Sequence, residues 1–372
     1  MRGKAAILDA RDGAFSVVEA DVPEPDANGI LVRQELCGIC GTDAYVYRGG
    51  LPGVVYPIVL GHETVGVVER LGANVGEDST GRPLAEGDRV YVAPGIACRR
   101  CVYCVVHQQP TLCLNRRGYG LRPPADAPPN FQGGFSQYLN LIPGSTFLKM
   151  DADATTSVVL EPLTIGLHQV SRVTMPVGST AVIQGAGAIG ILTLAAAREA
   201  GALRTIVVGA PHSRLELARE FGADVTLSIE EVPDPTERAR LVREETPGGL
   251  GADVVFECTG FPVAIPEGID MLRRGGTYVE AGHYTDHGDV ALNPFRHMVH
   301  KQITLVAVWG ADVPHFVAGR ALIESGKYPF ADLVSHTLPL ERVAEGIAAI
   351  GGTYRIDGVE IRKVAVAAHG TG

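Results

Sequence analysis

The sequence predicts a two-part α/β protein, with an all-β unit first and a doubly wound parallel sheet after it. Residues 1–95 form short apolar stretches separated by turn residues, which is typical of strands. From Thr180 onward, apolar strands alternate with helical segments, and this alternation predicts a parallel sheet. With 372 residues, 46% of them hydrophobic, the chain is long enough for about two or three domains with large cores.

The charge and the cysteine content limit the function. A formal net charge of -10 argues against nucleic acid or an anionic membrane as the main partner, because both attract basic surfaces. The sequence has no apolar run typical of a signal peptide or a membrane helix. We therefore expect a cytoplasmic protein with a small-molecule substrate, whose seven cysteines are metal ligands or buried thiols.

The N-terminal unit is expected to resemble a β-barrel. Its strands are separated by Pro-Glu-Pro, Gly-Gly and Gly-Glu-Asp clusters. The expected strands are 4–8, 15–19, 29–36, 62–71 and 88–92, with a further strand after the Gly-Gly at 133–134. The proline-rich run 121–130 predicts an ordered surface loop.

Residues 37–63 gather a thiolate, an imidazole and a hydroxyl. Cys40 and His62 are ligand types that Zn²⁺ prefers, and Thr42 lies between them in the chain. Two or three protein ligands with one position left open is the coordination of a catalytic zinc rather than a structural one. The stretch therefore predicts a catalytic metal site.

A second cluster of cysteines predicts a structural zinc. Four thiols occupy sixteen positions with two, two and eight residues between them, at Cys98, Cys101, Cys104 and Cys113. Such spacing can close a tetrahedral four-thiolate site, whose metal replaces the hydrophobic core that a short loop lacks. An iron-sulfur cluster or idle thiols are the alternatives. The arginines beside the cluster, Arg99, Arg100, Arg116 and Arg117, are expected to be solvated charges.

Glu161 is an acidic residue inside an apolar, helix-like run over 154–170. An unpaired buried carboxylate is costly, so the residue needs a partner. A metal ion would supply one, and a helix cap or a salt bridge would supply another. The residues alone leave these alternatives open.

A glycine-rich turn at Gly185 predicts a dinucleotide site. The motif G-x-G-x-x-G comprises Gly185, Gly187 and Gly190, with Ala188 and Ile189 before the last glycine. It follows a short apolar strand and opens an alanine-rich helix, the context in which backbone and helix N-terminus can receive a pyrophosphate. Further strands are expected at 204–208, 225–229, 252–258, 277–281 and 303–309, and helices at 213–221, 235–245, 262–273 and 313–325.

The end of the second strand bears on the choice of cofactor. NAD enzymes of this fold usually have an acid there, which binds the ribose hydroxyls and repels a 2'-phosphate. This chain has Gly209, followed by His212, Ser213 and Arg214 as donors that could reach a phosphate. The missing acid permits NADP without requiring it, and Arg214 could equally stack on adenine or lie in solvent. We expect NAD or NADP, with a lean to NADP.

Taken together, these motifs resemble the zinc-dependent medium-chain alcohol and polyol dehydrogenases. The motifs occur in the family's order, and they are Cys40-Gly-Thr42-Asp43, Gly61-His62-Glu63, the four cysteines, Glu161-Pro-Leu and the glycine turn. The resemblance implies a GroES-like β-barrel catalytic domain, a Rossmann cofactor domain and two zinc ions per chain. It also implies hydride transfer between an alcohol carbon and a nicotinamide.

The resemblance further implies roles for single residues. Cys40, His62 and Glu161 would bind the catalytic zinc, with Glu63 beside the metal or exchanging with a ligand. A proton relay would begin at the Thr42 hydroxyl, but Tyr45 stands where the family has a histidine. Arg362 matches the family's pyrophosphate-binding arginine, and a surface charge is the alternative.

An acid at position 161 is similar to the sorbitol, threonine and glucose dehydrogenase branch. It favours a secondary alcohol (a polyol, cyclitol, sugar or cyclic alcohol), oxidised to the ketone or formed in reverse. A primary alcohol or aldehyde dehydrogenase of the same family, or a zinc-binding relative without activity, is the alternative. A metal-free reductase or a nucleotide-binding structural protein of the same fold would lack Cys40 and the cysteine cluster, and the acidic charge weighs against a zinc-finger regulator.

The expected domain order follows from these assignments. We expect a catalytic domain over 1–158 with the zinc lobe at 95–117, a cofactor domain over 159–298, and a return to the catalytic domain over 299–372. The segment 299–325 is expected to connect the domains and to contribute to a homodimer or homotetramer.

Overall fold

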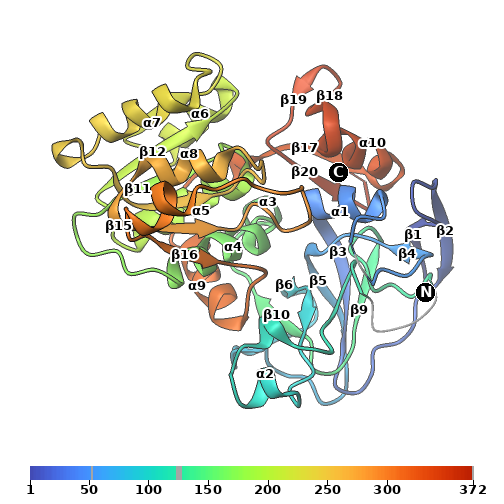
Figure 1. Cartoon of the computed structure of the whole chain (residues 1–372). Helices are drawn as coiled ribbons and strands as arrows, with labels where there is room; N and C mark the ends of the chain where they lie inside the picture. The colour runs from blue at the N-terminus through green and yellow to red at the C-terminus, as the bar shows by residue number, and fades with distance from the viewer. Residues whose placement is uncertain (52, 123–127, 371–372) are drawn as a thin grey trace. The chain divides into compact units, whose positions relative to one another are not determined.

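The computed structural model describes residues 1–51, 53–122 and 128–370 (Figure 1). Part of the proline-rich loop expected at 121–130 lies outside these residues. The chain divides into two compact units: unit 1 contains residues 1–161 and 312–372, and unit 2 contains residues 162–311. Helix α4 (Leu160–Ser171) carries the boundary between them.

Unit 1 is built on two β-sheets. The order is β2-β1-β4 in the smaller sheet and β10-β6-β5-β3-β20-β17 in the larger one, where β9 also pairs with β3. The strands are β1 (Arg2–Leu8), β2 (Phe15–Asp21), β3 (Ile30–Ile39), β4 (Ile58–Val59), β5 (Glu63–Leu71), β6 (Arg89–Ala93), β9 (Tyr138–Leu141), β10 (Thr146–Lys149), β17 (Val334–Pro339) and β20 (Lys363–Ala367). Two short hairpins complete the unit, β7 (Gly95–Ile96) with β8 (Arg117–Gly118), and β18 (Arg355–Ile356) with β19 (Val359–Glu360).

Strand β20 lies inside the larger sheet. It pairs antiparallel with β3, where Val364 faces Ile39, and parallel with β17 on its other side. All five residues of β20 are buried. The last strand of the chain therefore completes the sheet that begins in the first 40 residues.

The helices of unit 1 are short except for α9. They are α1 (Gly41–Tyr47), α2 (Val102–Val105), α3 (Ala154–Ser157), α9 (Val313–Glu324) and α10 (Val343–Ala348). The chain also forms 3-10 turns at Pro110–Leu112, Phe330–Leu333 and Leu340–Arg342, and a π-helical turn at Ala349–Thr353. One apolar core joins β1, β3 and the C-terminal segment, where Phe131, Phe135 and Val364 are fully buried.

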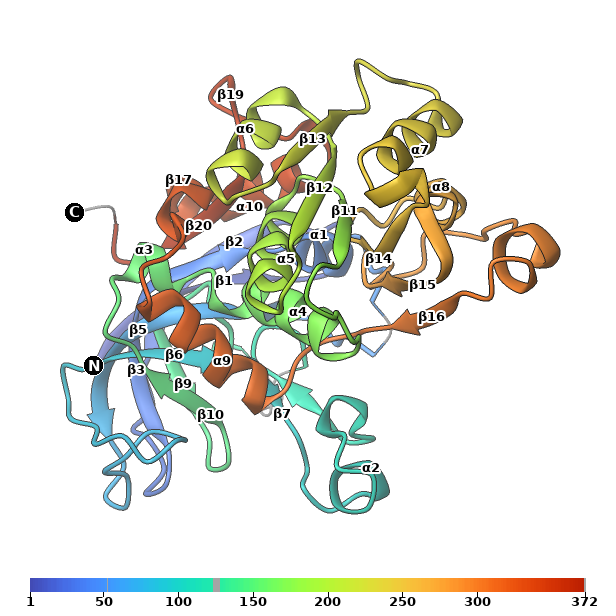
Figure 2. The same ribbon diagram turned by 90° about the vertical axis from the view of Figure 1, so that its left-hand side faces the viewer.

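Unit 2 is a six-stranded parallel sheet with the order β13-β12-β11-β14-β15-β16 (Figure 2). Its strands are β11 (Thr180–Gln184), β12 (Arg204–Gly209), β13 (Val225–Ser228), β14 (Ala252–Glu257), β15 (Leu272–Glu280) and β16 (Thr304–Ala307). Its helices are α5 (Ala188–Glu199), α6 (His212–Glu220), α7 (Pro235–Glu244) and α8 (Ala264–Met271), with a 3-10 turn at Pro247–Gly249 and a π-helical turn at Pro294–Val299. The sheet grows in both directions from β11, so right-handed crossovers place helices on both faces. The predicted doubly wound domain is confirmed.

The helix expected over 154–170 is interrupted. The Asp153 side chain accepts a hydrogen bond from the Thr156 backbone N–H at 2.9 Å and caps α3, which ends after one turn. Helix α4 then begins at Leu160. The interruption places Glu161 in the first turn of a new helix.

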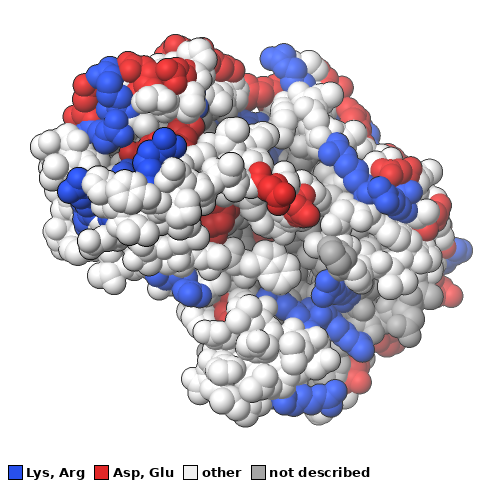
Figure 3. Space-filling view, in the orientation of Figure 1, with Lys and Arg blue, Asp and Glu red and all other residues white. Residues whose placement is uncertain are grey.

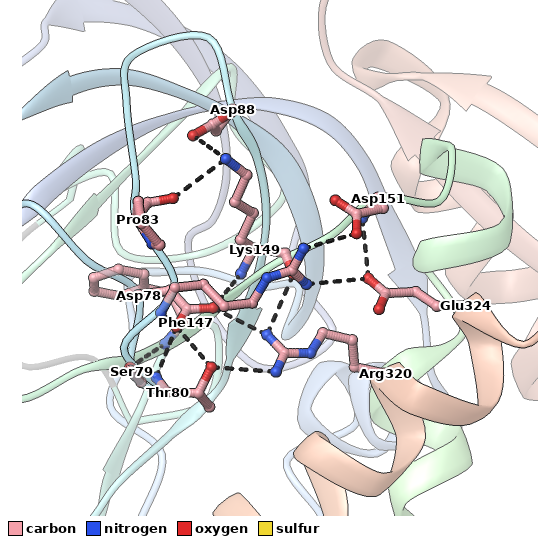
Figure 4. Close-up of polar contacts among 11 residues, drawn as sticks. Asp78, Ser79, Thr80, Pro83, Asp88, Phe147, Lys149, Asp151, Arg320 and Glu324 are labelled. Carbon is pink, nitrogen blue, oxygen red and sulfur yellow. Dashed lines mark hydrogen bonds and ion pairs between the residues drawn. The ribbon is translucent and has the colours of Figure 1, made fainter.

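A buried aspartate fastens α9 to the barrel of unit 1 (Figure 4). Asp78 accepts hydrogen bonds from the backbone N–H groups of Thr80 at 2.7 Å and Lys149 at 2.9 Å. Arg320 of α9 donates to the same carboxylate at 3.0 Å. Glu324 of α9 accepts from the Asp151 backbone N–H at 3.0 Å. These bonds order the loop after β5 and hold α9 against β10.

The charged surface is mixed in sign. Lysines, arginines and acids intermingle over α6 and α7 (Figure 3). The lobe that contains α2, residues 95–117, has four arginines and no acid. On α7, Arg240 pairs with both Glu237 and Glu244. Within the described residues, no helix combines the length and the apolar character needed to cross a membrane.

Candidate metal and cofactor sites

Cys40 is positioned by the start of α1. Its backbone N–H donates to the Asp43 carboxylate at 2.8 Å, a reciprocal cap that fixes the first turn. The Thr42 Oγ1 lies 3.5 Å from the Cys40 Sγ. Tyr45 lies half-buried one turn after Thr42, so the two side chains share a face of α1.

His62 lies beside the same aspartate. The loop before β5 brings its Nδ1 to 3.4 Å from the Asp43 Oδ1, and both side chains are buried. Neither atom completes a hydrogen bond of good geometry. Burial would lower the pKa of His62, but the Asp43 charge and the close polar contacts with Asp43 and Cys40 raise the pKa well above its usual value. The pocket therefore favours a positive charge, and a metal cation fits these residues.

Glu63 is the first residue of β5 and is paired with a lysine from the other end of the chain. Lys363 donates from Nζ to the Glu63 Oε1 at 2.6 Å and to the Ile39 carbonyl at 3.2 Å. Both side chains are buried. A Cβ on Gly38 would lie 1.9 Å from the Glu63 Oε2, so only glycine leaves room for this pair.

Cys40, His62 and Glu63 come closest together. One ligand atom from each lies within 4.8 Å of the other two. Glu161 stands outside this group, but its charge acts on the same site. Burial raises the pKa of Glu161 to about 7, while the His62 charge opposes the rise and the Glu63 charge adds to it. Its backbone N–H donates to the buried Tyr91 hydroxyl at 3.1 Å, which positions the first turn of α4.

The four cysteines of the lobe converge as their spacing predicts. Their sulfur atoms all lie within 4.8 Å of one another, with Cys101 Sγ at 3.5 Å from Cys104 Sγ and 3.9 Å from Cys113 Sγ. Four sulfurs about 2.3 Å from a tetrahedral zinc are about 3.8 Å apart, close to these distances. All four thiols are free. The backbone N–H of Arg100 lowers the pKa of Cys98 to about 6, which favours the thiolate that binds metal.

The glycine turn of unit 2 has the shape of a phosphate cradle. Gly185 has φ +105°, which disfavours any side chain, and a Cβ on Gly190 would lie 1.9 Å from the Gly185 carbonyl oxygen. Gly187 precedes α5 without a capping side chain, and a Cβ there would meet nothing within 4 Å. The first N–H groups of α5, from Ala188 and Ile189, therefore stand at an uncovered helix N-terminus. This arrangement fits a dinucleotide pyrophosphate.

Two family models match the chain in the regions that carry these sites. The alcohol dehydrogenase GroES-like domain matches residues 26–152, and the zinc-binding dehydrogenase domain matches residues 188–324. The 5-exo-hydroxycamphor dehydrogenase of Pseudomonas putida is 31% identical over 339 residues, covering 89% of this chain and 91% of its own. The chain belongs to the zinc-dependent medium-chain alcohol dehydrogenase family.

Other members of this family support the assignment. The L-threonine 3-dehydrogenase of Bacillus subtilis is 31% identical, covering 92% of this chain and 94% of its own. The structure of an alcohol dehydrogenase from Thermotoga maritima aligns with a TM-score of 0.91 and 30% identity over 99% of both chains. A zinc-binding dehydrogenase from Sinorhizobium meliloti, solved with NADP, aligns with a TM-score of 0.83 and 29% identity, again over 99% of both. The predicted family, fold and enzyme class, an NAD(P)-linked alcohol dehydrogenase, are confirmed.

The residues expected beside the cofactor ribose lie around the end of β12. A Cβ on Gly209 would lie 2.7 Å from the Ala186 backbone nitrogen, so this strand end packs tightly against the glycine turn. His212 is exposed and faces Glu216 at 3.4 Å. Arg214 is half-buried in the first turn of α6, where its backbone N–H donates to the Pro211 carbonyl at 3.0 Å.

Arg362 is exposed and donates to the Asp332 carbonyl at 3.1 Å, so in this structure its guanidinium caps a turn of its own unit. The next residue, Lys363, is the one that reaches Glu63 in the candidate metal site. Sequence reasoning missed this lysine.

Sequence reasoning also missed three other residues at or near the candidate catalytic site. Asp43 was visible in the Cys-Gly-Thr-Asp motif, but its contact with His62 depends on the fold. Tyr91 is fully buried and marks no motif. Arg116 was expected to be solvated, and this expectation was wrong: it is half-buried, and burial lowers its pKa while Asp312 and Glu161 oppose the change.

Proposed function

We propose that Cys40, His62 and Glu161 bind a catalytic zinc, with Glu63 beside it, and that the four lobe cysteines bind a second, structural zinc. The observation that carries the proposal is the buried pair of His62 and Asp43 next to Cys40, whose facing atoms lack a complete hydrogen bond. The sulfur spacing in the lobe supports the second metal.

The reaction that we infer is oxidation of a secondary alcohol to a ketone, or the reverse. Relatives are named for hydroxycamphor, for threonine oxidised at C3 and for D-xylulose. An acid at position 161 supports the same branch of the family. The proposal names the class of substrate and no single compound. Turnover should therefore be screened with a panel of polyols, cyclitols, sugars and cyclic alcohols.

The chain's own residues supply positioning and proton transfer. When bound, zinc supplies Lewis-acid polarisation of the substrate oxygen. Asp43 orients the His62 ring through Nδ1, which leaves Nε2 available as a ligand atom. Thr42, 3.5 Å from the Cys40 sulfur, is placed to begin a proton relay, in which its hydroxyl would accept the substrate proton while donating its own proton onward to solvent; Tyr45 lies one turn further along α1. Lys363 offsets the charge of Glu63 next to this centre.

Substitution of His62 tests the catalytic site. His62→Ala is expected to abolish turnover of secondary alcohols and to remove one of two zinc ions, because a zinc ligand is lost; the protein should remain folded, since the site is open and its neighbours can hydrate. Circular dichroism should show a folded protein. Wild-type turnover in a His62→Ala protein that contains only one zinc would refute the assignment.

Glu161 requires its own experiment. If it is a ligand, Glu161→Ala should lower catalytic zinc occupancy and turnover together. If it serves only as a helix or salt-bridge residue, the melting temperature should fall while activity per folded molecule is retained. That second outcome would leave a site built from Cys40, His62 and Glu63.

We further propose NADP as the preferred cofactor. Gly209 carries no charge to repel a 2'-phosphate, and Arg214 lies in the first turn of the next helix. The test is the ratio of kcat/KM for NADP over NAD in the wild type and in Arg214→Ala. A strong preference for NAD that Arg214→Ala leaves unchanged would contradict the proposal.

The oligomer that we propose forms through the edge of the unit 2 sheet. Strand β16 is the outer strand, and large apolar side chains near it are exposed: Leu305 and Trp309 at 53%, Phe295 and Val299 at 67%. Edge strands with apolar side chains pair readily with another chain. Light scattering should give a mass above one chain, which Leu305→Glu lowers and the exposed control Val177→Glu does not. A monomeric wild type would overturn this proposal.

A further inference from the structure

Two acids and a histidine converge in unit 2, and none of the three is a predicted zinc ligand. Glu257 is the last residue of β14, and Glu280 is the last residue of β15. The two are directly opposite in the parallel register. His283 follows three residues after Glu280. All three therefore lie at the carboxyl edge of the sheet, where open α/β folds bind ligands.

The distances among the three side chains fit a common cation. His283 Nδ1 lies 3.0 Å from the Glu280 Oε1 and 3.5 Å from the Glu257 Oε2. One ligand atom from each lies within 4.8 Å of the other two. Ligand atoms about 2.1 Å from one metal ion are about 3.0 to 3.4 Å apart in octahedral or tetrahedral geometry.

The turn after β14 fixes the orientation of the Glu257 carboxylate, whose Oε2 faces His283. The backbone N–H groups of Thr259 and Gly260 donate to the Glu257 Oε1 at 2.6 Å and 3.0 Å. A Cβ on Gly282 would lie 2.0 Å from the Glu257 Oε2, so glycine at that position keeps the space beside this oxygen clear. The Gly260 N–H also reaches the Glu257 Oε2 at 3.2 Å, and this second oxygen faces His283.

The cluster also lacks a balancing charge. Glu257 is fully buried, and the Glu280 and His283 side chains are 18% and 15% exposed. No lysine or arginine in the described part of the chain forms an ion pair with either acid. Two buried atoms, the Glu280 Oε2 and the His283 Nε2, have no hydrogen-bond partner. Burial and the neighbouring Glu280 charge raise the pKa of Glu257 to about 7, because two close carboxylates resist ionising together.

We propose that Glu257, Glu280 and His283 bind a divalent metal ion, a third metal site in this chain. Two carboxylates and one imidazole suit first-row ions such as Mn²⁺ or Zn²⁺, whereas the sulfur-rich sites select zinc. A divalent ion neutralises both carboxylates at once. A protonated His283 between two acids is the competing arrangement, and it requires no metal.

The ion would join two turns of unit 2. It would hold the segment that begins at His283 against the turn after β14. That turn is next to the glycine cradle, since a Cβ on Gly185 would lie 2.9 Å from the Thr259 Cγ2. The ion would therefore act as a clamp beside the glycine cradle, held by residues other than the predicted zinc ligands.

Manganese binding tests the site in the full chain. The zinc-saturated protein is titrated with Mn²⁺, and free Mn²⁺ is followed by electron paramagnetic resonance. We expect one Mn²⁺ bound per chain, with Glu280→Gln and His283→Asn each weakening binding by about tenfold or more. Asp289→Asn removes an exposed acid from the same segment and serves as the control with unchanged binding. Mn²⁺ should also raise the melting temperature of the wild type, but not of the two site variants.

The competing arrangement gives a different result. Absence of a stoichiometric Mn²⁺ site in the wild type, together with a zinc content of no more than two per chain, overturns the proposal. Equal Mn²⁺ affinity in the wild type and in both site variants, verified as folded, overturns it as well. Neither result bears on alcohol oxidation, which is measured with zinc alone.

Discussion

The ion pair between Glu63 and Lys363 is expected to control the stability of unit 1. The two side chains are 0% and 6% exposed, so the pair belongs to the buried class rather than to the weak surface class. Lys363→Met leaves Glu63 as an uncompensated buried charge, and breaking such a pair costs about 3 to 5 kcal/mol. With an m value of about 3 kcal/mol/M, the urea midpoint should fall by about 1 to 2 M.

A double-mutant cycle separates the pair from its individual members. Lys363→Met, Glu63→Gln and the double variant are unfolded in urea at constant excess zinc and followed by circular dichroism. The double variant should be more stable than Lys363→Met, because the unpaired charge is gone. Arg240→Met breaks an exposed pair on α7 and should leave the midpoint nearly unchanged. Additive effects of the two single substitutions would refute the reasoning.

Three further predictions address other parts of the chain. Cys101→Ser should lower the yield of folded protein and release the structural zinc, measured by metal content, because the lobe depends on its metal; a folded lobe variant with two zinc ions would contradict this. Arg320→Met should reduce unfolding free energy by about 2 kcal/mol in urea, since Asp78 loses a charged donor but keeps its backbone donors; an unchanged midpoint would count against it. Without added Mn²⁺, the pKa of Glu257 is about 7 in the folded protein and an ordinary 4.5 in the unfolded chain, so the folded state is more stable when Glu257 is protonated. About 3 kcal/mol of stability, fully present below pH 4.5, should therefore be lost as pH rises through 7, and Glu257→Gln should flatten the urea-derived pH profile.

The parts of the protein that were predictable depend on local chemistry. Each glycine of the 185–190 turn is needed for a local reason: Gly185 has a positive φ, Gly187 leaves open space before α5, and Gly190 lies close to the Gly185 carbonyl oxygen. The four cysteines likewise converge because their spacing in a short loop allows little else. Such sequence patterns can be recognised without knowledge of the tertiary fold.

The parts that were missed depend on long-range pairing. Lys363 meets Glu63 across 300 positions, and only the pairing of β20 with β3 brings them together. Adjacent residues of an extended segment point to opposite sides, so a one-residue difference separates the exposed Arg362 from the buried Lys363. The resemblance to the family pointed to Arg362. The sheet pairing determines that Arg362 is exposed and Lys363 is buried.

The place of β20 inside the larger sheet has a consequence for protein synthesis. Unit 2 is continuous in sequence, so it can fold as soon as residue 311 has left the ribosome. Unit 1 must wait for residues 363–367, and until then the end of β3 at Cys37–Ile39 lacks the partner strand β20. The nascent chain therefore carries an incomplete sheet through most of its elongation, with an exposed edge that is open to aggregation. Chaperone dependence during translation should follow the emergence of β20 rather than the completion of the cofactor domain.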